Sequence, residues 1–253
     1  MNIESAHSFE NKEGIPQVDV LAIVGHSIEE DKIRGWVPTR LIQKMDESKK
    51  RTGVRDRGLR SDDDLSYVGG GNAVALAAAE AYNVLLARGM PPKAVSAVSG
   101  RPLYLKKAPS EMNEGAIMLA AFTKKIQRQP DAVIALGTAR NTQGELEAHL
   151  KMCVERGYKT IGFLLLDLRV ERAEALLNRL KAEHPEFLPI ETHCLSTENL
   201  LRSRYQDNPA RLGHVEKMFA AFTASKAYAK TVADEKSGTE AIRKGTYKGK
   251  GNY

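Results

Sequence analysis

The sequence has little cysteine and no long apolar run, and both absences exclude classes of protein. The two cysteines, Cys153 and Cys194, are too few and too far apart for a disulfide framework or a clustered zinc site. No apolar run approaches the roughly 20 residues of a membrane-spanning helix, and residues 1–5 lack a basic region followed by an apolar stretch. We therefore expect reduced thiols, a cytoplasmic location, and neither secretion nor a membrane span.

Length and composition are those of a globular chain with a sizeable core. The 253 residues are 42% hydrophobic and 28% charged, which fits one large domain or one domain with an appendage. The net charge of +6 is unevenly placed, because residues 200–253 carry 11 Lys and Arg against 5 Asp and Glu, whereas residues 1–199 carry 27 of each. A basic C-terminal segment is therefore the feature to explain.

Apolar segments rich in β-branched residues alternate with helical patterns, which predicts repeated βα units. The expected strands cover residues 18–24, 94–98, 132–136, 160–166 and 190–194. The expected helices cover residues 72–88, 110–127, 142–156, 170–182 and 212–232. The predicted fold is an α/β, Rossmann-like, doubly wound and mainly parallel sheet of about five strands, with helices on both faces.

The remaining segments fall outside this alternation. Residues 1–17 are expected to form a flexible N-terminus before an α/β domain over residues 18–199. Residues 44–64 hold 13 charged residues in 21, which predicts a solvated excursion, either a plain exposed loop or a lid over a ligand. A helical segment is expected over residues 200–235. Residues 236–253, with four glycines among Lys, Thr and Tyr, are expected to form a disordered basic tail.

The loops after the predicted strands indicate where a ligand would bind. In an open parallel sheet the crevice lies outside the carboxyl ends of the strands, where helix N-termini favour anions. The loops share small, hydroxyl and basic residues, and the candidate ligand-binding residues are Gly25, Ser27, Ser99, Gly100, Arg101, Asn141, Thr142, Asp167, Arg169 and Arg172. His26 is the best-placed group for proton transfer, with a structural histidine as the alternative. These loops predict a site for one small, polar and anionic molecule.

Two of these candidate groups also have structural interpretations. Thr142 and Glu145 are spaced as a capping box, in which each side chain satisfies the other's backbone donor. Arg169 and Arg172 lie on the first turn of a predicted helix, where a cation opposes the helix dipole at a cost of about 0.3 to 1 kcal/mol. That cost favours a role in holding a carboxylate or phosphate, and the alternative is a surface ion pair with Asp167 or Glu171.

Several short motifs between residues 18 and 180 occur in a characteristic order. They are Ile23-Val24-Gly25, Val98-Ser99-Gly100, Ser110-Glu111-Met112-Asn113-Glu114, Asn141-Thr142 with Glu145, and Arg172-Ala173. Their order and spacing resemble the SanA/ElyC/YdcF-like family, whose function is largely unknown. The resemblance implies a Rossmann-like sheet with a shared polar crevice, a link to the bacterial envelope, and an adenosine-containing ligand such as S-adenosylmethionine.

The resemblance also implies particular site residues, namely Ser99, Gly100, Glu111 or Glu114, Asn141, Thr142, Glu145 and Arg172. With His26, the two glutamates Glu111 and Glu114 would supply acid-base capacity for an unidentified transferase or hydrolase. Two positions depart from the family pattern: Arg169 stands where the family usually has a histidine, and Asn72 where an arginine often opens the first helix. These departures bear on catalysis more than on binding.

The basic C-terminal segment supports a hypothesis of another class. In it the chain is a non-catalytic binding or scaffold subunit whose tail engages nucleic acid or an acidic protein. The excess positive charge is sufficient for salt-sensitive phosphate contacts, and a solvated tail is the simpler alternative. No metal site is expected, because the six histidines show no ligand spacing.

Overall fold

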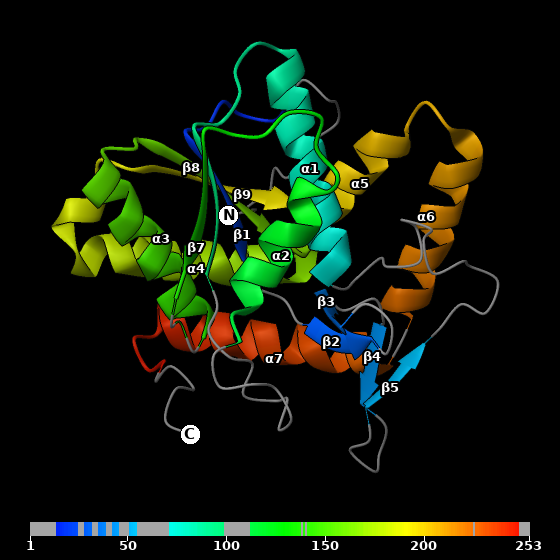
Figure 1. The fold of residues 1–253 in the computed structure, drawn as a ribbon. Helices are drawn as coiled ribbons and strands as arrows, with labels where there is room; N and C mark the ends of the chain where they lie inside the picture. Colours follow the sequence, from blue (N-terminus) through cyan, green and yellow to red (C-terminus); the bar gives the residue numbers. More distant parts are fainter. Residues whose placement is uncertain are drawn as a thin grey trace.

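The central element of the fold is a five-stranded parallel sheet. The computed structural model describes residues 14–24, 28–31, 35–38, 42–45, 51–54, 71–98, 112–137, 139, 141–224 and 226–247. The sheet strands are β1 (Val20–Val24), β6 (Ala94–Val98), β7 (Ala132–Leu136), β8 (Thr160–Leu165) and β9 (Glu191–Ser196), in the order β7-β6-β1-β8-β9 (Figure 1). The predicted parallel α/β sheet is confirmed, and each of its strands coincides with a predicted segment to within a few residues.

The pleat of β1 explains why its sequence is apolar without interruption. Successive side chains of a strand point to opposite faces, so both sets are buried when helices cover both faces. Leu21 and Ile23 belong to one hydrophobic cluster, and Val20, Ala22 and Val24 belong to a second cluster on the other face. The sheet therefore separates two cores.

Helices cover both faces of the sheet, as a doubly wound fold requires. Figure 1 shows α1 (Gly71–Ala87), α2 (Glu114–Thr123) and α5 (Thr197–Tyr205) on one side, and α3 (Thr142–Arg156) and α4 (Asp167–Glu183) on the other. A single 3-10 turn, η3 (Pro185–Phe187), connects α4 to β9. None of the helices in the described ranges is long and apolar enough to cross a membrane.

The strand order places a topological switch point beside β1. The chain proceeds outward from β1 through β6 to β7, and then returns to β8 on the other side of β1. The crossovers on the two sides of β1 diverge at the carboxyl ends of β1 and β8, and a crevice forms where they separate. Ligands of doubly wound sheets bind in a crevice of this kind. The fold thus confirms the topology on which the predicted site depends.

Two antiparallel hairpins between β1 and α1 were not predicted. They pair β2 (Ile28–Asp31) with β3 (Gly35–Pro38), and β4 (Ile42–Met45) with β5 (Arg51–Val54). The second hairpin lies partly within the charged excursion, so the prediction of a plain loop is wrong for its described part. Each of these strands has only four residues, the shortest run in which an alternating pattern can indicate a strand. The rest of the excursion, including residues 55–64, lies outside the described residues.

The C-terminal segment forms two helices, α6 (Pro209–Thr223) and α7 (Lys226–Arg243). Figure 1 shows α7 lying side by side with α4 along the lower side of the view. Thr239 is only 3% exposed and Ile242 only 6%. The prediction of a disordered tail is therefore wrong for residues 236–247, because a few buried side chains and several ion pairs anchor this polar helix. Residues 248–253 lie outside the described part.

Candidate functional site

The structure describes only some of the predicted site residues. Glu114, Asn141, Thr142, Glu145, Asp167, Arg169 and Arg172 are described. The other predicted residues lie outside the described ranges, and their roles stay predictions: Gly25, His26, Ser27, Ser99, Gly100, Arg101 and Glu111. The described residues all belong to α2, α3 and α4, which follow β6, β7 and β8 and therefore begin at the carboxyl edge of the sheet.

The first turn of α2 lies directly against β6. Asn113 is the N-cap, and its side-chain oxygen accepts a hydrogen bond from the Ala116 backbone N–H at 3.0 Å. A Cβ added to Gly115 would lie 3.0 Å from the Ala97 carbonyl oxygen, so only glycine allows this close approach. The arrangement places Glu114, which is only 5% exposed, at the carboxyl end of β6.

The helix α3 begins with a different cap from the predicted one. The Asn141 side-chain oxygen accepts a hydrogen bond from the Gly144 backbone N–H at 2.9 Å. The interpretation of Thr142 and Glu145 as a capping box is therefore wrong, because the cap lies one residue earlier and the box would need an acidic residue at position 144. Thr142 is instead the first helical residue, and Glu145 is buried in the first turn with 7% exposure.

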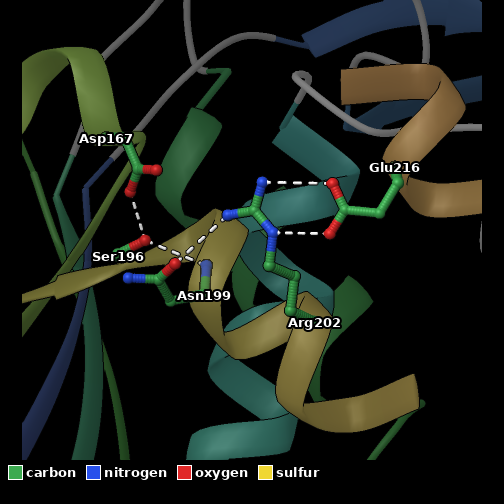
Figure 2. A network of polar contacts seen from close by, with 5 residues as sticks. All are labelled: Asp167, Ser196, Asn199, Arg202 and Glu216. Atoms are coloured by element: carbon green, nitrogen blue, oxygen red, sulfur yellow. Dashed lines mark hydrogen bonds and ion pairs between the residues drawn. The ribbon is translucent and has the colours of Figure 1, made fainter. Parts of the chain in front are cut away.

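A pair of carboxyl groups joins the carboxyl ends of β8 and β9. The Ser196 hydroxyl donates a hydrogen bond to Asp167 and accepts one from the Asn199 backbone N–H at 2.9 Å, which caps α5 (Figure 2). The Asp167 backbone N–H donates to a carboxyl oxygen of Glu198 at 2.9 Å. Burial, together with the nearby Asp167 charge, holds the pKa of Glu198 well above its usual range.

Sequence reasoning named Asp167 but missed Ser196 and Glu198. The signal was present, because serine is a preferred N-cap residue and an acidic residue comes two positions after Ser196, as at many helix starts. The predicted strand of residues 190–194 ended before Ser196, so the following helix start was not considered. The structure extends that strand to Ser196 and begins α5 at Thr197.

The carboxyl pair continues into a polar network that connects α5 to α6. Figure 2 shows Arg202 reaching both oxygens of Glu216, at 2.7 and 3.4 Å, and the Asn199 side-chain oxygen at 3.2 Å. The Arg202 guanidinium also lies over the ring of Phe219, 4.7 Å from its centroid. This bidentate pair fixes α5 against α6 and hence the position of the helix start that carries Glu198.

One property is common to the helices that follow the last four sheet strands. Each has an acidic residue in its first turn: Glu114 in α2, Glu145 in α3, Asp167 in α4 and Glu198 in α5. Carboxylates are favourable there because the helix N-terminus carries a partial positive charge. Together they give the described carboxyl edge a negative character, which favours ligand groups that are cationic or that donate hydrogen bonds.

The arginine pair of α4 differs from this pattern and has its own partner. The Arg172 guanidinium donates to Glu235 at 3.2 Å and to the Tyr247 hydroxyl at 2.7 Å, and the Arg169 Nε lies 3.9 Å from Glu235. The predicted ion pair with Asp167 or Glu171 is therefore wrong in its partners. The predicted contact of both arginines with a bound anion stays a prediction.

A cavity of about 230 Å³ lies between the start of α4 and the middle of α7. Asp167 from α4 and Tyr228, Glu235 and Lys236 from α7 line it. Burial raises the pKa of the Tyr228 phenol, with a contribution from the charges of Glu198 and Asp167. Asp167 is thus the residue that connects the carboxyl pair with an accessible space.

Within the described ranges, no group of three or more His, Cys, Asp and Glu side chains is placed to hold a metal ion. Comparisons of the chain with protein-family models, with curated proteins and with solved structures find no significant match.

Proposed function

We propose that this chain is a SanA/ElyC/YdcF-like protein that binds a small nucleotide-like ligand at the carboxyl ends of its strands. The ligand class is an adenosine-containing molecule, with S-adenosylmethionine as the leading candidate, and the reaction class is group transfer or hydrolysis. The observation that carries the proposal is the row of first-turn carboxylates along the crevice edge, from Glu114 and Glu145 to Asp167 and Glu198.

The chemistry of these groups supports an adenosine-containing ligand. Carboxylates accept hydrogen bonds from ribose hydroxyls and neutralise cationic groups such as the ammonium or sulfonium of S-adenosylmethionine. The doubly wound sheet supplies the crevice, because its switch point adjoins β8 and therefore the start of α4. Asp167 lies at that start and lines a cavity, so it is the residue assigned to the ribose or to the cationic group.

Acid-base capacity is assigned to Glu114 and to the pair of Asp167 and Glu198. A carboxyl group with a raised pKa, such as that of Glu198, can give and accept a proton near neutral pH. Glu198 is buried and bonds the Asp167 backbone, so it would act through Asp167 rather than on the ligand itself. The roles predicted for His26 and Glu111 remain part of the proposal.

The test is a binding measurement with a matched pair of variants. We expect S-adenosylmethionine or S-adenosylhomocysteine to bind in isothermal titration calorimetry, and Asp167→Asn to weaken binding by roughly tenfold through loss of one charged hydrogen-bond acceptor. Glu147→Gln is the control, because Glu147 is not one of the first-turn carboxylates and pairs with Lys151 one turn further along α3. Equal affinity of Asp167→Asn and the wild type would contradict the assignment, and absence of binding by both compounds would contradict the ligand class.

The hypothesis of a binding subunit that uses a basic tail stays a prediction. Several positive charges of that segment have partners within the chain, since Arg243 pairs with Glu171 and Lys244 with Glu240. No contact among the described residues favours nucleic acid or an acidic protein as a partner. The crevice is therefore the site on which the proposed function depends.

A further inference from the structure

Among the described residues, the carboxylate that pairs with the two arginines of α4 belongs to the C-terminal helix. Arg169 and Arg172 lie one turn apart at the start of α4, at the carboxyl end of β8. Their charged partner, Glu235, is 63 residues later than Arg172 in the sequence and belongs to α7, outside the βα units of the sheet. The second partner of Arg172, Tyr247, follows α7. The α/β domain thus presents two cations at its ligand edge, and the C-terminal segment covers them.

The carboxylate of Glu235 satisfies this pair incompletely. One of its oxygens accepts a hydrogen bond from Arg172, while the other is 3.9 Å from the Arg169 Nε, which is an ion-pair distance beyond hydrogen-bond range. Within the described part of the chain, the Nε–H groups of both arginines are buried and have no hydrogen-bond acceptor. A phosphate group offers more acceptor oxygens than a carboxylate and matches the fork of a guanidinium.

The contact between α4 and α7 is polar at its centre. Gly238 allows the approach, since a Cβ there would lie 3.3 Å from the Arg172 Nε and 3.4 Å from its Cδ. The apolar anchor is Ile242, which packs into the cluster around α3 and α4. The cavity of about 230 Å³ already separates α7 from the first residues of α4. The ion pairs across this interface are those of Glu235 with the two arginines and that of Arg243 with Glu171. An anion that binds Arg169 and Arg172 competes with the first of these interactions.

We propose that Arg169 and Arg172 form a binding site for the phosphate or carboxylate of a small ligand, and that Glu235 occupies this site in the ligand-free chain. A bound anion displaces Glu235 and weakens the contact of α7 with α4, so α7 acts as a strap that opens when the ligand binds. This inference rests on the proposed function, because it states how the anionic part of a nucleotide-like ligand is held and regulated. It uses different residues from the carboxylates assigned to the ribose and the cationic group.

The first experiment measures the affinity of the full-length chain for inorganic pyrophosphate by isothermal titration calorimetry. If Glu235 competes with the anion, Glu235→Gln should bind pyrophosphate roughly tenfold or more tightly than the wild type, because the binding-competent fraction rises. Glu240→Gln is the matched control, since Glu240 lies on the same helix, carries the same charge, and pairs only with the exposed Lys244 among the described residues. The control should bind pyrophosphate as the wild type does.

The second experiment uses the wild-type chain and does not depend on the folding of a variant. Hydrogen exchange of the amides in residues 226–247 is compared with and without pyrophosphate, at ionic strength matched with sodium chloride. We expect pyrophosphate to accelerate exchange in α7 and to leave β1 and β8 unchanged. Unchanged exchange in α7, or equal affinity of Glu235→Gln and the wild type for pyrophosphate, overturns the proposal.

The two proposals fail in different ways. If S-adenosylmethionine binds in a manner that depends on Asp167 but pyrophosphate does not compete with Glu235, the strap is wrong and the proposed function stands. If pyrophosphate binds at Arg169 and Arg172 but no adenosine compound binds, the anion site stands and the ligand class is wrong. Arg172→Ala, added to Glu235→Gln, separates specific from non-specific binding of pyrophosphate. If binding is specific, this second substitution should abolish the increase in pyrophosphate affinity that Glu235→Gln produces.

Discussion

Glu198 illustrates how a buried acid makes stability depend on pH. Burial and the adjacent Asp167 raise its pKa to about 8, against 4.5 for an unperturbed glutamate. The folded state therefore binds the proton more tightly than the unfolded state. The resulting stabilisation is fully present below pH 4.5 and is lost as the pH rises toward 8.

The expected consequence is that Glu198→Gln stabilises the chain at alkaline pH. The amide keeps an oxygen that can accept the Asp167 backbone N–H, and it removes the charge that the folded state disfavours. The free energy of unfolding, measured with urea, should fall between pH 5 and pH 8 in the wild type. This fall should be about 1 to 4 kcal/mol larger than the fall in the variant. Glu240→Gln, at an exposed position, should leave the difference unchanged. If the free energy of unfolding of Glu198→Gln falls as much between pH 5 and pH 8 as that of the wild type, the pH dependence belongs to another group.

His149 is expected to give the opposite pH dependence. It is completely buried, it shares a hydrogen bond of 3.0 Å with the Ser96 hydroxyl, and burial lowers its pKa to about 3. Because the folded state disfavours the charged ring, stability is full above pH 6.5 and falls below it. The wild type should lose about 2 kcal/mol of unfolding free energy from this group between pH 7 and pH 5. His149→Gln should abolish this loss, and the half-exposed His184→Gln should not.

The second half of α7, from residue 236, is where the prediction from sequence failed most clearly, whereas the first half lies within the predicted helical segment of residues 200–235. The composition of α7, Lys and Glu with few apolar residues, is that of a solvated segment. What anchors it is the position of a few residues relative to α4: Ile242 in the core, Thr239 against the helix, and Glu235 opposite Arg172. Such a docking depends on long-range contacts that local composition does not encode.

Deletion of α7 tests this docking. Removal of residues 226–253 takes away the buried Ile242 side chain and leaves Arg169 and Arg172 without their carboxylate, so we expect the melting temperature to fall by roughly 10 °C. Removal of residues 248–253 alone should change it by less than about 2 °C, because the contacts that dock α7 on α4 belong to residues up to Tyr247. Differential scanning calorimetry of the two truncations provides the measurement. Equal melting temperatures would mean that α7 does not pack on α4 in solution.

The sheet elements could be predicted because each has a local signal. Residues 94–98 and 132–136 coincide with β6 and β7, and the capping asparagine Asn141 precedes a helix at the predicted place. The hairpins between β1 and α1 lack such a signal, since their strands are short and polar. The start of α5 has one at Ser196, but the strand that leads into it was predicted to end at residue 194. For the same reason the site prediction included Asp167 and omitted its partners on β9 and α5.

The two cores of the molecule are joined through shared strands. In β1, alternate residues belong to the cluster beneath α1 and to the cluster beneath α3 and α4. The strand β8 contributes Leu164 to the first cluster and Phe163 to the second. Because both cores contain side chains of the same strands, unfolding of one core would disrupt the strands on which the other core packs. The α/β domain should therefore unfold as one cooperative unit.

A destabilising variant on one face of the sheet should therefore lower the urea midpoint that a probe on the other face reports. Ile23→Ala opens a cavity in the cluster that contains Tyr82, where its cost is expected to be about 2 to 5 kcal/mol. Cys153 belongs to the opposite cluster, and its burial raises the thiol pKa to about 12, so the thiol should be unreactive until the domain unfolds. Both chains compared carry Cys194→Ala, so that Cys153 is the thiol that is labelled. Ile23→Ala should lower the urea midpoint for labelling of Cys153 and the urea midpoint of the near-ultraviolet signal of the aromatic residues by the same amount. A labelling midpoint that stays at the wild-type value while the optical midpoint falls would show that the two cores unfold separately.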